Sequence, residues 1–232
     1  MSNDPLLLLF DVDGTLLRGA TDAHGEALRA ALHEVHGIDA ARVRSTLAPA
    51  GRTDGEIARA ILLGAGISAQ RIDDRYDDVR EACCRHYAEL CPPDLSEFVL
   101  PGVPALLGEL AGGSATLALL TGNYEPVARL KLARAGVGRW FAPRKGAFGS
   151  DAEDRVALPP IARRRAGTPG HPFPRERTIV IGDTPRDIAC AHADDLRCIA
   201  VATGPFKADE LTDADAVVGS AREIAGAVAA LD

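Results

Sequence analysis

The chain of 232 residues is long enough for one or two domains with a substantial core. Hydrophobic residues make up 47% of it and charged residues 25%, as in an ordinary globular protein. The net charge of −7 and the aromatic content of 4% disfavour nucleic acid and acidic membranes as partners. No apolar run has the length of a membrane span, no signal peptide is apparent, and the five cysteines show neither a disulfide framework nor zinc spacing. We therefore expect a cytoplasmic protein with reduced cysteines.

Short apolar runs alternate with helical patterns along most of the chain. The apolar runs predict strands at 6–10, 116–120, 178–181, 198–201 and 216–218. Helices are predicted between and after the later strands, at 125–135, 158–166, 185–193 and 221–231. Buried strands that alternate with helices are typical of a doubly wound, Rossmann-like α/β fold with a mostly parallel sheet.

The region 16–100 departs from this alternation. It contains no convincing strand, and its apolar periodicity predicts helices at 22–36, 54–63 and 69–90. Proline and glycine mark its C-terminal end at Pro92, Pro93, Pro101 and Gly102. We expect residues 1–15 and 101–232 to form the α/β core, with 16–100 inserted as a helical cap after the first strand.

Two carboxylates, Asp11 and Asp13, follow the first predicted strand directly, and Gly14 follows them. At the end of a buried strand, one carboxylate can act as a nucleophile while the other transfers a proton. Glycine lets the backbone turn away from such a site without steric hindrance. Asp-Gly is also a common turn dipeptide, so the motif alone leaves both interpretations open.

Polar residues also follow two later strands. Thr121, Gly122 and Asn123 come after 116–120, whereas Asp183 and Asp187 come after 178–181. Ligands gather at the C-terminal edge of a parallel sheet, so these residues are predicted to meet Asp11 and Asp13. Clustered carboxylates repel one another unless a cation lies among them, and an oxygen-only ligand set favours Mg²⁺.

Each of these polar groups has a structural alternative. The segment Thr121–Gly122–Asn123 is also consistent with a turn and a helix cap. Asp187 stands three residues after Thr184, with Pro185 at the first helical position, which is the pattern of a capping box. Asp183 has no such alternative, so it is the stronger candidate metal ligand.

Taken together, these motifs resemble those of the haloacid dehalogenase-like hydrolase superfamily, in its phosphoglycolate-phosphatase-like branch with a helical cap of the C1 type. The resemblance rests on the motif Asp11-Val12-Asp13-Gly14-Thr15-Leu16, on Thr121, and on the segment from Gly182 to Asp187. It implies that Asp11 attacks phosphorus to form an aspartyl-phosphate. It also implies that Asp13 protonates the leaving oxygen and then deprotonates the hydrolytic water.

By the same resemblance, Mg²⁺ would be held by the Asp11 carboxylate, the Asp13 main-chain carbonyl and Asp183. Asp187 would support the ion directly or through water. Thr121 would bind phosphate oxygens, and Gly122 and Asn123 would contact the substrate beside it. The dehalogenases of the superfamily lack an acid at the position of Asp13, so dehalogenation is disfavoured.

The chain departs from the family pattern at the third motif. The family usually has a lysine followed by proline there, and this sequence contains no Lys-Pro pair. Arg155 stands at the corresponding place before a proline-started helix, and a guanidinium can supply the required positive charge. Lys145 is the alternative.

Within the predicted cap, the segment Gly51-Arg52-Thr53-Asp54 resembles a loop that reaches the active site in related proteins. Arg52 and Thr53 are therefore candidate substrate contacts, although Thr53 and Glu56 also fit a capping box. The predicted cap contains no lysine, which disfavours the phosphonate-cleaving and hexose-phosphate mutase relatives.

The sequence thus predicts a Mg²⁺-dependent phosphatase acting on a small phosphorylated metabolite, as a monomer or homodimer. A phosphomutase, which passes the phosphoryl group to a sugar, is the first alternative. A non-enzymatic phospho-acceptor or sensor domain is the second, and the proton-carrying Asp13 disfavours it.

Overall fold

The structure is a computed structural model that describes residues 5–43 and 47–232. Its core is one six-stranded sheet in the order β3-β2-β1-β4-β5-β6, and all of the pairings are parallel. The strands are β1 (Leu7–Phe10), β2 (Thr116–Thr121), β3 (Ala147–Phe148), β4 (Thr178–Gly182), β5 (Arg197–Val201) and β6 (Ala216–Val218). This topology confirms the predicted α/β fold class.

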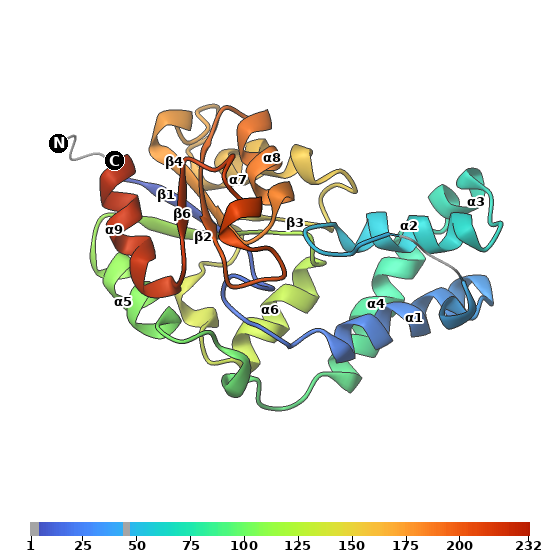
Figure 1. Ribbon diagram of the computed structural model, residues 1–232. Helices are drawn as coiled ribbons and strands as arrows, with labels where there is room; N and C mark the ends of the chain where they lie inside the picture. Colours follow the sequence, from blue (N-terminus) through green and yellow to red (C-terminus); the bar gives the residue numbers. More distant parts are fainter. Residues whose placement is uncertain (1–4, 44–46) are drawn as a thin grey trace.

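Helices cover both faces of the sheet (Figure 1). One face packs against α5 (Val103–Gly112), α6 (Glu125–Arg134) and α9 (Ala221–Leu231), and the other against α7 (Leu158–Ala166) and α8 (Pro185–Ala193). The alternation of strand side chains decides which residue meets which face. In β1, Leu8 and Phe10 pack on the face covered by α5, α6 and α9, whereas Leu7 and Leu9 pack on the face covered by α7 and α8. Burying each such side chain contributes about 1.5–3 kcal/mol.

The central strand β1 brings the motifs to one edge. Phe10 pairs with Leu119 of β2 on one side and with Ile181 of β4 on the other. The chain segments that follow these three strands therefore emerge next to one another. The amide of Asp11 continues the ladder by donating to the carbonyl of Ile181 at 2.9 Å.

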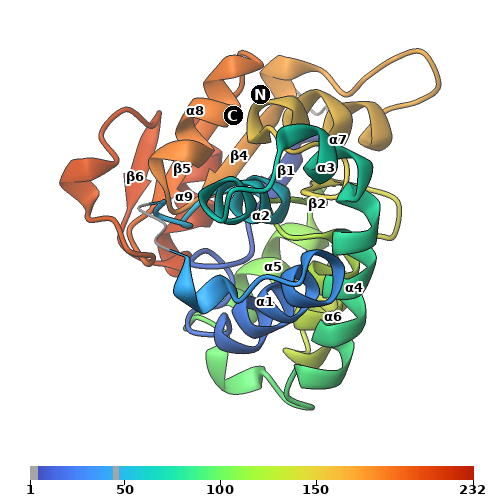
Figure 2. The same ribbon diagram turned by 90° about the vertical axis from the view of Figure 1, so that its right-hand side faces the viewer.

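A helical cap lies beside that edge of the sheet (Figures 1 and 2). It consists of α1 (Asp22–His36), α2 (Asp54–Gly64), α3 (Ala69–Asp74) and α4 (Tyr76–Leu90). The predicted single helix 69–90 is wrong, because the chain breaks at Arg75 between α3 and α4. The buried residues Ile72, Val79 and Ala82 keep a helical spacing across the break, so periodicity could not reveal it.

The cap packs firmly onto the core. The Thr53 hydroxyl donates to the carbonyl of Glu153, and the Tyr76 hydroxyl donates to the carbonyl of Gly149 at 3.3 Å. Arg59 of α2 forms an ion pair with the Glu153 carboxylate. Apolar side chains of the sheet and of the cap also belong to one continuous cluster. Helices α1–α4 therefore lie against the sheet edge through both polar and apolar contacts.

Among the described residues, no helix is both long and apolar enough to cross a membrane.

Candidate active site

A cleft of about 890 Å³ lies between the C-terminal edge of the sheet and the cap. The core side of the cleft carries most of the predicted site residues: Asp11, Asp13, Thr121, Gly122, Asn123, Arg155 and Asp183. The cap side contributes mainly apolar and basic side chains, among them Leu28, Arg29, Arg52, Ile57 and Ile61. One end of the cleft is thus densely charged, and the other has an aliphatic wall.

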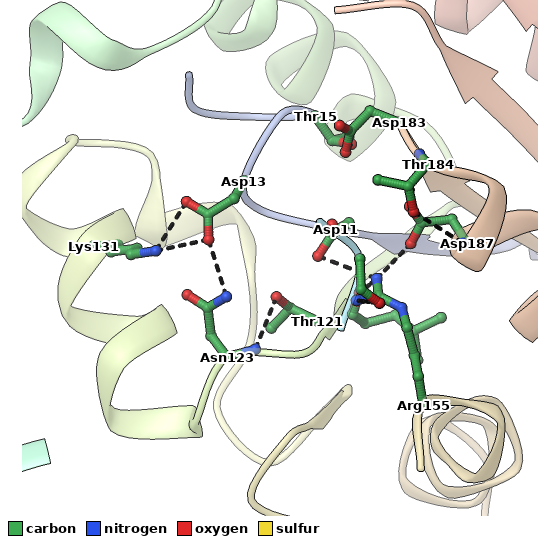
Figure 3. A network of polar contacts seen from close by, with 12 residues as sticks. Asp11, Asp13, Thr15, Thr121, Asn123, Lys131, Arg155, Asp183, Thr184 and Asp187 are labelled. Carbon is green, nitrogen blue, oxygen red and sulfur yellow. Dashed lines mark hydrogen bonds and ion pairs between the residues drawn. The ribbon is translucent and has the colours of Figure 1, made fainter. Parts of the chain in front are cut away.

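Asp11 lies at the charged end and is 5% exposed. Its carboxylate oxygen Oδ1 is 3.4 Å from a guanidinium nitrogen of Arg155 (Figure 3). Burial raises the pKa of Asp11 to about 6, the Arg155 charge opposes this shift, and the Asp187 charge adds to it. Asp11 is thus a buried carboxylate that faces the cleft and is paired with a cation.

Arg155 begins a 3₁₀ turn (Arg155–Ala157) before α7 and is itself buried. Its guanidinium pairs with the Asp187 carboxylate and donates to the carbonyl of Gly51 in the cap at 3.2 Å. Its Nε is buried and has no partner among the described residues. Lys145, the alternative predicted for this position, is not among the residues that line the described cleft. The structure therefore places the Arg155 guanidinium, rather than the Lys145 ammonium, against Asp11.

Asp11, Asp183 and Asp187 form a carboxylate cluster whose ligand atoms all lie within 4.8 Å of one another. Burial and the charges of Asp187 and Asp11 together raise the pKa of Asp183 to about 9, although the Thr15 hydroxyl and the Arg155 charge oppose this shift. Among the described residues, these three carboxylates share one cation, Arg155, so a site built only from oxygen ligands fits a hard divalent cation such as Mg²⁺.

The two outer aspartates of the cluster differ in their remaining contacts. Oδ1 of Asp183 accepts from the Thr15 hydroxyl at 3.1 Å. Oδ2 of Asp187 accepts from the amide and hydroxyl of Thr184, which confirms the predicted capping box of α8, and Oδ1 pairs with Arg155. Both Asp187 oxygens are therefore occupied by protein groups, which leaves Asp183 freer to bind an ion.

Glycine is required where the first motif passes Asp183. Gly14 has a φ of +89°, and a Cβ atom at this position would overlap the Asp183 carboxylate. The left-handed backbone and the close approach both exclude a larger residue.

Asp13 lies away from Asp11 and faces α6 (Figure 3). Its two carboxylate oxygens are 2.9 and 2.7 Å from Nζ of Lys131, and Oδ2 also accepts from the side-chain amide of Asn123 at 3.0 Å. Burial alone would raise the pKa of Asp13, but the charge of Lys131 and the hydrogen bonds from Lys131 and Asn123 lower it below its ordinary value. Asp13 is thus present as a carboxylate, the form that accepts a proton.

Sequence reasoning missed Lys131. It is fully buried, on the same stripe of α6 as Val127, Ala128 and Leu132. The spacing of Val127, Ala128 and Leu132 is a weak local signal, because α6 as a whole shows little separation of apolar and polar residues. The partner, 118 residues earlier in the chain, could not be read from that pattern.

The remaining predicted substrate contacts divide into two groups. Thr121, Gly122, Asn123 and Arg52 line the cleft, and the Thr121 hydroxyl accepts from the amide of Asn123 at 3.4 Å. Arg52 is held by the Glu56 carboxylate and by the carbonyl of Ala48.

Thr53 is not among the described residues that line the cleft. Its side chain is fully buried, and its hydroxyl caps α2 by accepting from the amide of Glu56 at 3.1 Å. The structure therefore gives Thr53 a role in capping and in joining cap to core, and its hydroxyl is directed to these partners rather than to the described cleft.

The chain is similar to known proteins in both sequence and fold. The family model described as haloacid dehalogenase-like hydrolase matches residues 8–192. A phosphoglycolate phosphatase of Rhodospirillum rubrum is 29% identical over 205 residues, which cover 86% of this chain and 80% of that protein. A probable phosphatase, IndB, of Dickeya dadantii is 28% identical over 242 residues, which cover 97% of this chain and 94% of that protein.

Among solved structures, a predicted phosphatase from Clostridium acetobutylicum superposes with a TM-score of 0.68 at 16% identity. The match covers 98% of this chain and 99% of that one. At this identity the likeness concerns the fold alone.

Proposed function

Because this chain belongs to the haloacid dehalogenase-like hydrolase family, we propose that it is a Mg²⁺-dependent phosphatase of small phosphate monoesters, with Asp11 as nucleophile. The observation that carries the proposal is the different environment of the two carboxylates after β1. Asp11 lies among the cluster carboxylates beside Arg155, whereas Asp13 is held by Lys131 and Asn123. Two neighbouring carboxylates with separate partners can take separate chemical roles.

In the first step of the proposed reaction, a carboxylate oxygen of Asp11 attacks phosphorus and the ester oxygen departs as an alcohol. Asp13 gives the departing oxygen its proton. The side chain of Asp13 is 25% exposed, so it can take up that proton from solvent in the cleft. The Arg155 guanidinium faces the negative charge that gathers on the phosphoryl oxygens during transfer.

In the second step, a water molecule attacks the phosphorus of the aspartyl-phosphate. Asp13, again a carboxylate, accepts the proton of that water, and the bond between phosphorus and the Asp11 oxygen breaks to release inorganic phosphate. Thr121, at the end of β2, lies on the cleft wall where its hydroxyl can donate to a phosphoryl oxygen.

Asp11 and Asp183 would hold the metal, with Asp187 behind them and the main-chain carbonyl of Asp13 completing the set. When bound, Mg²⁺ offsets the repulsion between the anionic nucleophile and the anionic phosphate. The aliphatic wall formed by Leu28, Ile57 and Ile61 would accommodate the organic part of the ester. The relationship to a phosphoglycolate phosphatase makes phosphoglycolate the first substrate to test.

The test is phosphate release from a panel of phosphate monoesters, including phosphoglycolate and larger esters with apolar groups, with and without Mg²⁺. Wild type is compared with Asp11→Asn and with the matched control Asp213→Asn, which changes an exposed aspartate outside the site. We expect Mg²⁺-dependent turnover that Asp11→Asn abolishes and Asp213→Asn retains.

Three results would contradict the proposal. One is turnover that survives Asp11→Asn. Another is a stable phosphorylated Asp11 with no phosphate release, which would favour a phospho-acceptor domain. The third is transfer to a sugar without free phosphate, which would favour a phosphomutase.

A further inference from the structure

Lys131 is a completely buried cation in α6. It contacts Asp13 and is not part of the carboxylate cluster of Asp11, Asp183 and Asp187. A buried ammonium is strongly unfavourable unless it is paired and hydrogen-bonded. Nζ lies 2.7 and 2.9 Å from the Asp13 oxygens and 3.2 Å from Nδ1 of His24. Lys131 is thus satisfied from two directions, by a core carboxylate and by an imidazole from the cap.

His24 continues the chain of contacts into the cap. Its Nε2 is 3.0 Å from Oδ2 of Asp54, and that oxygen also accepts from the amide of Tyr124 at 2.7 Å. An ammonium has only donors, so Nδ1 of His24 must accept from Lys131, and the Nε2–H group must donate to Asp54. The imidazole packs edge-on against the Tyr87 ring, with centroids 5.6 Å apart, which further restricts its orientation.

The members of this chain of contacts come from both parts of the molecule. His24 lies in α1 and Asp54 in α2, whereas Lys131 and the Tyr124 amide belong to the core. His24 and Asp54 are 9% and 3% exposed, so these contacts are shielded from water. The orientation of the Lys131 ammonium therefore depends on α1 and α2 lying over the sheet edge.

The two carboxylates after β1 accordingly have separate cations. Arg155 contacts Asp11 and Asp187, and Lys131 contacts Asp13. We propose that Lys131 is a positioning residue for Asp13, and that His24 and Asp54 of the cap hold Lys131 in place. This inference rests on the proposed function, because Lys131 would align the carboxylate that transfers protons in that reaction.

A leaving-group comparison tests the positioning role. An alkyl phosphate expels a strongly basic oxygen that needs a proton, whereas para-nitrophenyl phosphate expels a stable phenolate that does not. The first chemical step is measured by leaving-group release under single-turnover conditions with enzyme in excess. The alkyl ester is the one that wild type hydrolyses fastest.

The variants are Lys131→Met, which keeps the length of the side chain without its charge, and His24→Leu, which removes both imidazole contacts. Lys145→Met is the matched control. We expect Lys131→Met to slow release of the alcohol about 100-fold, the low end of general acid–base contributions, with little change in KM. Release of the phenolate should change far less, and His24→Leu should show the same selectivity with a smaller effect.

Equal slowing of both leaving groups by Lys131→Met would overturn the proposal, because it would show a general structural role. If Lys131→Met does not fold, His24→Leu provides the test. The proposal would be overturned if His24→Leu released both leaving groups at the wild-type rate, or if it slowed both by the same factor. Absence of Asp11-dependent release in wild type would instead contradict the proposed function, so the two failures can be distinguished.

Discussion

Arg155→Met removes the guanidinium that contacts Asp11 and Asp187 while keeping an unbranched apolar side chain. At the observed 3.4 Å, the attraction between Arg155 and Asp11 is about 5 kcal/mol for an effective dielectric constant of about 20. Part of this attraction is offset by desolvation and by rearrangement of the site. In other enzymes, removing one preorganised electrostatic donor weakens transition-state binding by about 3–4 kcal/mol. We therefore expect kcat/KM to fall by about 10²- to 10³-fold.

The same substitution leaves Asp187 without its cation in a buried position. Breaking a buried ion pair by removing one partner costs about 3–5 kcal/mol, which for a chain of this size lowers the Tm by roughly 10 °C. Activity is therefore measured well below the Tm of the variant, with folding checked by circular dichroism.

The assay is steady-state hydrolysis of the best substrate by wild type, Arg155→Met and Lys145→Met. The control also replaces a basic residue by methionine, at a position that does not line the described cleft. Activity in Lys145→Met should stay near that of wild type. If Lys145→Met loses activity and a folded Arg155→Met does not, the assignment of the third-motif charge to Arg155 is wrong.

Three further predictions concern the metal, the contact between cap and core, and acid stability. Mg²⁺ at 100 times its dissociation constant should stabilise the fold by about 2.7 kcal/mol, and a Tm that is the same in EDTA and in Mg²⁺ would contradict a metal at the carboxylate cluster. Gly122→Ala should lower both Tm and activity, because its Cβ would overlap the carbonyl of Arg52; a wild-type Tm would show that the cap does not pack on this loop as observed. Burial alone would raise the pKa of Asp194, but its hydrogen bonds from Arg163 and Arg175 lower it, so its stabilising contribution is present at neutral pH and is lost as pH falls through the lowered pKa. Asp194→Asn should therefore lower the free energy of unfolding, measured in urea, by roughly 3 kcal/mol at pH 7. The loss of stability on acidification should also be smaller in the variant than in wild type, and an unchanged pH dependence would count against this pairing.

Local patterns in the sequence were sufficient for most of the fold. The apolar runs predicted five of the strands, and the capping pattern at Thr184 predicted the start of α8, because both signals depend on neighbouring residues. The two-residue strand β3 and the helix α5 were not predicted. β3 (Ala147–Phe148) is too short to show periodicity and exists only through its pairing with β2. The placement of Asp11 and Asp183 at one edge also followed from the sequence, since parallel strands end together.

The partner of each charged group was decided only by the tertiary structure. Nothing local to Lys131 indicates that it meets Asp13, since the two are far apart in the chain and are joined by the packing of α6 beside the first motif. Thr53 has the local pattern of both a cap residue and a substrate contact, and the docking of the cap onto Glu153 turned its hydroxyl inward. Secondary structure follows from interactions between residues a few positions apart, which a sequence displays directly. The pairing of buried charges depends on distances between elements, and these exist only once the sheet and the cap have packed together.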